Sequence, residues 1–240
     1  MCVWGSGDPS GLEAPSWGPH LCAMKHGFLA VLFVLCALPQ LARADRWADT
    51  GAVSVTLSVF NDAAAPPQDL ERAKVQAQFV MERAGVRLDW IDCGSPDHRR
   101  SNAGCAAISF PRHLSVRVVS RTNQVSTDVF GQSFQDAQGL GNYALVYYPR
   151  LRASAAAKSI NSGDLLGLVV AHELGHLLLG LASHSSAGLM SAVWGKEELR
   201  QAKRGDFFFS ESEGRRMVSR FIAAANLETS PTSNARLDGK

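Results

Sequence analysis

The sequence has little of three features that would point to particular classes of protein. Its net charge is only +2 over 240 residues, so its charge gives no case for binding nucleic acid. We find no internal repeat and no long low-complexity tract. Beyond the start of the chain, no apolar stretch reaches the roughly 20 residues that a membrane-spanning helix needs. We therefore expect a mature protein with no membrane span and no nucleic-acid partner.

The start of the chain differs from the rest. Residues 1–23 are rich in Gly, Pro and Trp and show no periodicity. From Met24 a short basic start, an apolar run over residues 28–38 and the small residues Ala42 and Ala44 follow in the order typical of a secretory signal peptide. We interpret Met24 as the true start and expect cleavage after Ala44. The mature protein would then be secreted or periplasmic.

The mature chain would form one domain over residues 45–226, followed by a polar tail over residues 227–240. Of the five cysteines, only Cys93 and Cys105 lie in this mature chain. Two cysteines twelve residues apart in an exported protein are expected to form one disulfide across a loop. We expect the domain to be a monomer.

The spacing of apolar residues predicts the order of elements within the domain. We expect strands over residues 52–60, 86–91, 114–119, 128–134 and 143–148. We expect helices over residues 68–83, from about 164 to 179, over 196–203 and over 211–225. The stretch 93–112 is predicted to be a polar loop. The order is a strand, a helix, several strands and then further helices, which indicates an α+β domain.

The clearest chemistry lies in the sequence His172-Glu173-Leu174-Gly175-His176, which has the pattern H-E-x-x-H. On a helix, His172 and His176 are neighbours on one face, about 5–6 Å apart at Cβ. That separation lets both imidazoles bind one zinc ion. Glu173 follows the first histidine and is placed to act as a general base on a zinc-activated water.

A third ligand depends on where this helix ends. Asp164 can cap its start, and Gly180 offers a stop because glycine readily adopts a left-handed conformation. If the helix continued, His184 would lie about 12 Å along the axis from His176, out of reach of the same metal. A turn at Gly180 instead lets His184 fold back and complete a three-histidine site.

With Met190 six residues after His184, this stretch resembles the metzincin clan of zinc endopeptidases. The clan has H-E-x-x-H, then a glycine, a third histidine and a methionine-containing turn beneath the metal. The resemblance implies a zincin-like α+β fold: a twisted, mostly parallel sheet, a backing helix, an active-site helix and C-terminal helices. It also implies zinc as the cofactor and a peptide or protein as the substrate, bound along the edge strand that we place near residues 128–134.

The chain departs from the clan's usual spacing, so we assign no named subfamily. The glycine lies eight residues after the first histidine instead of seven, and the third histidine lies twelve after it instead of ten. Some families use a tyrosine just after the methionine turn to stabilise the oxyanion, and residues 191–194 contain none.

Glu197 and Glu198 compete with His184 for the role of third ligand. They lie 21 and 22 residues beyond His176, near the spacing of the glutamate ligand in thermolysin-like enzymes. Gly180 and Met190 favour His184.

The segment that begins at Cys93 allows a second interpretation of the cysteines. Residues 93–97 resemble the cysteine switch of matrixin propeptides, in which a thiolate blocks the zinc. Such a segment should precede the catalytic domain, whereas this one follows a predicted strand and helix inside it. We therefore favour the disulfide with Cys105.

Two functions remain open at this stage. The first is an exported zinc endopeptidase. The alternative is a zinc-binding adhesion or structural protein without useful turnover. Glu173 favours the enzyme, because holding zinc alone does not need a carboxylate at that position.

Overall fold

The computed structural model describes residues 52–120 and 129–229. The predicted signal peptide, its cleavage site and most of the predicted polar tail lie outside the described residues.

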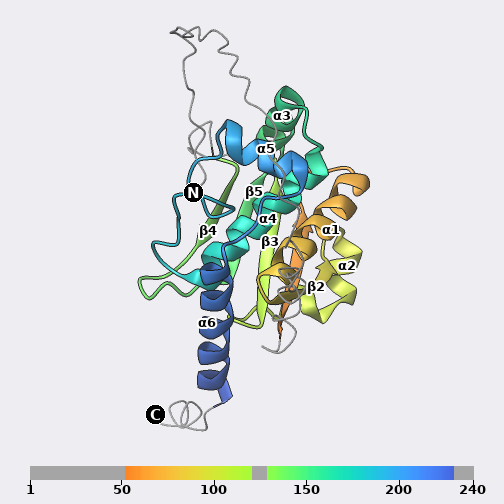
Figure 1. Cartoon of the computed structure of the whole chain (residues 1–240). Helices are drawn as coiled ribbons and strands as arrows, with labels where there is room; N and C mark the ends of the chain where they lie inside the picture. The colour runs from red at the N-terminus through yellow and green to blue at the C-terminus, as the bar shows by residue number, and fades with distance from the viewer. Residues whose placement is uncertain (1–51, 121–128, 230–240) are drawn as a thin grey trace, which may run out of the picture. The chain divides into compact units, whose positions relative to one another are not determined.

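Five strands form one sheet in the order β2-β1-β3-β5-β4 (Figure 1). They are β1 (Val53–Asn61), β2 (Val86–Asp92), β3 (His113–Val119), β4 (Gly131–Phe134) and β5 (Tyr143–Tyr147). Neighbouring strands are parallel except β4, which runs antiparallel to β5 at the edge. The predicted α+β fold with a mostly parallel sheet is confirmed, and the edge strand lies within the residues predicted for it.

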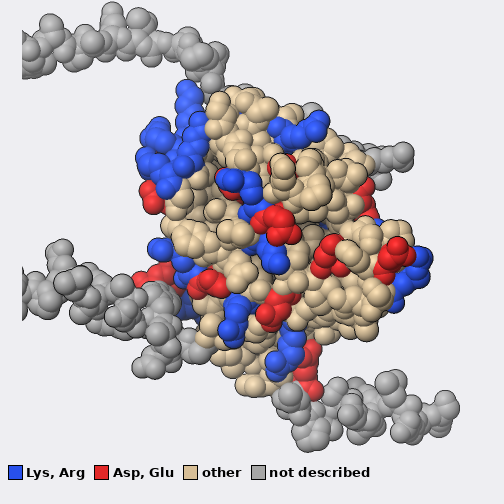
Figure 2. Space-filling model, turned by 90° about the vertical axis from the view of Figure 1, so that its right-hand side faces the viewer, with Lys and Arg blue, Asp and Glu red and all other residues tan. Residues whose placement is uncertain are grey.

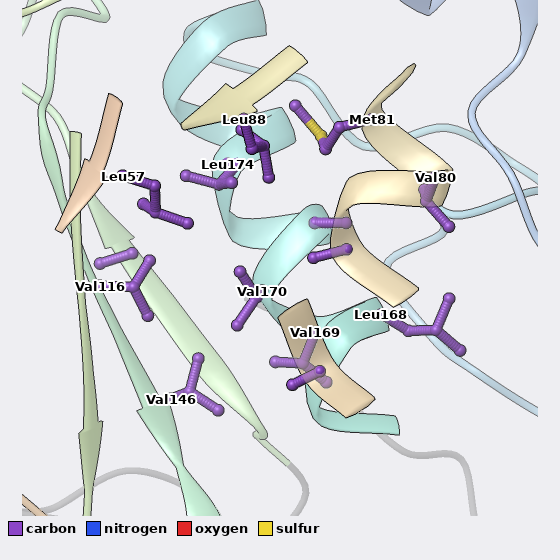
Figure 3. Packing of buried hydrophobic residues seen from close by; sticks show 14 of the residues in the cluster. Leu57, Val80, Met81, Leu88, Val116, Val146, Leu168, Val169, Val170 and Leu174 are labelled. Atoms are coloured by element: carbon purple, nitrogen blue, oxygen red, sulfur yellow. The ribbon is translucent and has the colours of Figure 1, made fainter. Parts of the chain in front are cut away.

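Two helices cover one face of the sheet: α1 (Pro67–Arg83) and α4 (Ser162–Leu179). Side chains from alternate strand positions, such as Val116 and Val146, point from the sheet toward Val170 of α4 (Figure 3). Nearly every side chain of α4 is buried, because the helix lies against both the sheet and α1. The core therefore surrounds the helix that carries the H-E-x-x-H sequence and holds it in place.

Glycine allows α1 and α4 to approach closely. A Cβ atom on Gly167 would lie 2.6 Å from the carbonyl oxygen of Ala73, and one on Gly163 would lie 2.8 Å from that of Asp69. Both distances are too short for real contacts. These two glycines are four residues apart and so lie on the same face of α4.

The opposite face of the sheet carries the disulfide. Residues 93–112, predicted to be a polar loop, contain the short helix α2 (Pro96–Ser101) and a 3-10 turn (Ala103–Cys105). The Ser95 side chain caps α2, which has proline in its first turn. The structure contains the predicted Cys93–Cys105 disulfide, which packs on Phe60 and Ile91.

Three further helices complete the described chain. The strand predicted to reach residue 148 ends at Tyr147, and α3 (Tyr148–Lys158) follows at once. The sequence pattern predicts no helix here. Pro149 lies in the first turn of α3, where proline is well tolerated. The predicted helices near 196 and 211 are α5 (Lys196–Arg204) and α6 (Glu211–Thr229). α6 extends beyond the predicted end at residue 225.

The visible surface mixes charges of both signs, with one larger group of Lys and Arg at the upper left of Figure 2. Within residues 52–120 and 129–229, no helix has the length and apolar character needed to span a bilayer.

Candidate metal centre

The helix that carries the site begins earlier than the sequence predicts. Asn161, not Asp164, caps α4, because its side chain accepts hydrogen bonds from the backbone N–H groups of Gly163 and Asp164. Asp164 lies in the first turn and forms a two-point ion pair with Arg72 of α1. Cap and ion pair together fix the start of α4 against α1.

His172 and His176 lie one turn apart on α4, and both are buried. Their Nε2 atoms are 2.9 Å apart. Zinc–imidazole bonds are about 2.0–2.1 Å long, so both atoms can reach one ion. The Nδ1 atom of His172 lies 2.7 Å from the carbonyl oxygen of Leu189. A carbonyl can only accept, so Nδ1 carries the proton and the Nε2 lone pair is directed toward His176.

The chain reverses after α4 and brings His184 beside the first two histidines. Gly180 ends the helix with φ +83°, as predicted, and Ala182 has φ +52°. This second left-handed residue accommodates the longer spacing between Gly180 and His184. The ring of His184 lies 4.6 Å from that of His176, centroid to centroid.

The three histidines form a group that could hold a metal ion. One ring nitrogen from each lies within 4.8 Å of those of the other two. Burial lowers the pKa of His172 to about 3 and that of His176 to about 2, and it also lowers the pKa of His184. Neutral imidazole is the form that binds metal. Three neutral imidazole nitrogens this close together fit the ligand set of a zinc ion.

Glu173 lies beside this group and is fully buried. Burial raises the pKa of its carboxyl to about 8, and Ser133 of β4 partly opposes this shift. Neither carboxyl oxygen makes a hydrogen bond of normal geometry within the described chain. A buried carboxyl without such partners is costly unless it has a function, and a raised pKa is typical of catalytic acids and bases.

Gly131 of β4 provides the space for this carboxyl. A Cβ atom at position 131 would lie 2.5 Å from one carboxyl oxygen of Glu173 and 2.8 Å from its Cγ. The edge strand therefore contacts the general base of the predicted mechanism directly. Nothing in the sequence pattern marks Gly131 for this role, because only the tertiary fold brings it to Glu173.

Met190 packs against the helix that carries the first two histidines. A Cβ atom on Gly175 would lie 2.6 Å from the sulfur of Met190, so the methionine packs on the backbone of α4 next to His176. The backbone N–H of Ser185 donates to the carbonyl oxygen of Met190, which ties this turn to the chain just after His184. Trp194 packs edge-on against the ring of His172.

Two polar residues that the sequence pattern does not predict, Ser183 and Gln135, contact His176. The hydroxyl of Ser183 is buried and lies 2.6 Å from Nδ1 of His176. The side-chain amide of Gln135, just after β4, donates to the backbone carbonyl of His176. A partner such as Ser183 on the second ring nitrogen orients a metal-binding histidine, while Gln135 holds the backbone at His176. Ser183 adjoins His184 in the sequence, but nothing in the spacing shows that it faces His176.

The glutamates of the alternative ligand set have other partners. Glu197 forms ion pairs with Arg200 and Arg204. Glu198 caps α5 by accepting from the backbone N–H of Gly195. The structure therefore brings His184, and neither glutamate, to the other two histidines. The alternative of a cysteine switch is excluded here, because the sulfur of Cys93 is bonded to that of Cys105.

Comparison with known proteins adds little to what the geometry of the site shows. No family model matches the chain, and no curated protein matches it. One similar solved structure is a zinc-dependent peptidase from Methanocorpusculum labreanum. It is 17% identical, with a TM-score of 0.46, and the match covers 67% of this chain and 99% of that one. A score this low carries no weight for the chemistry, so the assignment of the site rests on its own residues.

Proposed function

We propose that this protein is an exported zinc-dependent endopeptidase of metzincin-like design. The observation that carries the proposal is Glu173, a fully buried carboxyl next to three histidines that are close enough together to hold one metal ion. Holding a metal needs only the histidines. The cost of burying Glu173 is explained if its carboxylate takes part in proton transfer.

In this proposal His172, His176 and His184 hold the zinc ion. When bound, zinc would act as a Lewis acid that polarises the scissile carbonyl and acidifies a water molecule. Glu173 accepts the proton of that water and passes it to the leaving amine. Burial favours the protonated form of the Glu173 carboxyl, which suits a group that takes a proton from water. A bound zinc ion would favour the charged form and so help the carboxyl to release that proton again.

The substrate would bind along β4. This strand is one of the two edges of the described sheet, and its backbone can pair with an extended peptide. Gly131 at the start of β4 contacts Glu173, so a peptide paired to this edge would pass close to the base. Backbone pairing leaves both ends of the peptide unconstrained, which favours an endopeptidase.

Export is supported by the disulfide between Cys93 and Cys105. Disulfides persist in oxidising compartments such as the periplasm and the extracellular space. The signal peptide that starts at Met24 would deliver the chain there.

Substitution of Glu173 separates metal binding from catalysis. We expect Glu173→Ala to retain about one zinc ion per chain and to lose peptide cleavage by at least the 10²-fold typical of a general base. The measurement is metal analysis of the purified mature chain, paired with digestion of a peptide library with and without a chelator. Equal cleavage by the variant and the wild type would overturn the mechanism. A wild-type protein that holds zinc but cleaves no peptide would favour the adhesion or structural alternative.

A further inference from the structure

One face of α6 carries a hollow lined by arginine and serine. The hollow is shallow and open to solvent, and its lining residues all belong to α6: Ser212, Arg215, Arg216, Ser219 and Arg220, here called the arginine stripe. Their spacing of three and four residues places them on one side of the helix. The opposite side of α6 packs into the core through Met217, Phe221 and Ala225.

The positive charge of the stripe is only partly balanced. Arg215 pairs with Glu211 one turn earlier. In the part of the chain that the structure describes, Arg216 and Arg220 form no ion pair with a carboxylate. Three guanidinium groups around one hollow repel one another, so an anion bound among them would be stabilised by all three.

Arg220 is held in a defined position. One of its terminal nitrogens donates to the carbonyl oxygen of Gly139, in the turn between β4 and β5. Its guanidinium lies against the Cα of Gly180, where a Cβ atom would be 2.5 Å from the other terminal nitrogen. The Nε atom is buried without a hydrogen-bond partner in the described chain. Such an arginine loses little freedom when it binds a ligand.

This arrangement connects the stripe to the candidate metal centre. Gly180 ends α4 and donates its backbone N–H to the carbonyl oxygen of His176. Gly139 lies in the turn that follows the proposed substrate-binding strand β4. The stripe therefore begins where the metal-binding helix and the edge-strand hairpin meet, and it extends away from that point along α6.

We propose that the arginine stripe binds an acidic segment of the peptide or protein substrate, outside the residues at the cleaved bond. This inference rests on the proposed function. Eight residues of helix span about 12 Å. An extended peptide advances about 3.3 Å per residue, so about four residues cover the stripe. Carboxylates suit the stripe because arginine and serine both donate hydrogen bonds to them.

A binding measurement tests the stripe independently of catalysis. Full-length mature Glu173→Ala would be titrated with a labelled oligoglutamate peptide, followed by fluorescence anisotropy at low and high salt. We expect Arg216→Gln to weaken binding about two- to fivefold, as for one exposed charge pair at low salt, and high salt to remove most of the difference. Arg200→Gln on α5 is the matched control, because it removes an exposed arginine outside the stripe, and it should bind like the parent.

Equal binding by the Arg216→Gln and Arg200→Gln variants would overturn the proposal. So would displacement of the peptide by inorganic phosphate at a lower concentration than by free oligoglutamate, because the stripe would then be a phosphate site. In the active protein, Arg216→Gln should lower the ratio of kcat/KM for an acid-tailed peptide over its neutral counterpart. If the wild-type protein cleaved no peptide, the proposed function would be refuted. The anisotropy measurement would still decide whether the stripe binds an acidic peptide, because it does not depend on cleavage.

Discussion

Single residues decide the chemistry of the site, and His184 is the residue whose role the sequence left most open. It is the third member of the histidine group, whereas Glu197 pairs with arginines and Glu198 caps α5. We expect His184→Ala to weaken zinc affinity by at least tenfold, because one of three protein ligands is lost. The double substitution Glu197→Gln and Glu198→Gln should leave zinc affinity nearly unchanged.

A competitive zinc titration against a chromophoric chelator measures both variants. The variant with both Glu197→Gln and Glu198→Gln is also the control for a general effect of substitution on folding, since it changes α5 and leaves the three histidines in place. The reverse result, with zinc lost from the double variant and retained by His184→Ala, would favour a thermolysin-like ligand set.

The sequence predicted the site to the extent that the site is local. His172, Glu173 and His176 follow from helix spacing, and the approach of His184 follows from a glycine that can stop a helix. Gly131, Gln135 and Ser183 could not be predicted in these roles. Gly131 and Gln135 reach the site from another element, and no periodicity in the sequence encodes such a contact. Ser183 depends on the left-handed turn at Ala182, and alanine gives no signal of that conformation.

At the scale of elements, strands were easier to predict than the joins between them. The alternating pattern of β1 fixed its position to within a residue at each end. The ambiguity lay at Pro149 and Asn161. Proline is compatible both with the end of a strand and with the first turn of a helix, so the predicted strand includes Tyr148 and no helix is predicted over the rest of α3. Asn161 and Asp164 are both good caps, and only the hydrogen bonds distinguish them.

The contact between α1 and α4 gives a prediction at this scale. Gly167→Ala adds a methyl group that would lie 2.6 Å from the carbonyl oxygen of Ala73. Alanine favours a helix over glycine by about 1 kcal/mol, but overpacking against backbone costs about 1–3 kcal/mol. We expect a net loss of stability, with weaker zinc binding because α4 carries His172 and His176. Urea unfolding and zinc titration measure the two effects, and an increase in stability would show that the helices can separate at no cost.

For the whole molecule, the buried carboxyl of Glu173 couples folding to pH. Its pKa is raised from 4.5 to about 8 by burial, so in the zinc-free protein the folded state holds this proton more tightly than the unfolded state. The stability from this group is fully present below pH 4.5. It is lost as the pH rises from 4.5 to about 8, at up to ~1.4 kcal/mol per pH unit. Zinc-free Glu173→Gln lacks this titration.

The free energy of unfolding of both proteins should therefore be measured in urea, with a chelator present, at several pH values between 4.5 and 8. The wild type should lose stability relative to Glu173→Gln as the pH rises across this window. The lowered pKa values of the buried histidines act in the opposite direction, because they make the fold less stable in acid. The histidines titrate in both proteins, so their contribution cancels in the difference. Glu197→Gln, which removes an exposed carboxylate of α5, controls for the loss of one negative charge. Parallel curves for wild type and Glu173→Gln would mean that the carboxyl is solvated in the zinc-free protein, and its burial would then no longer support its role as the base.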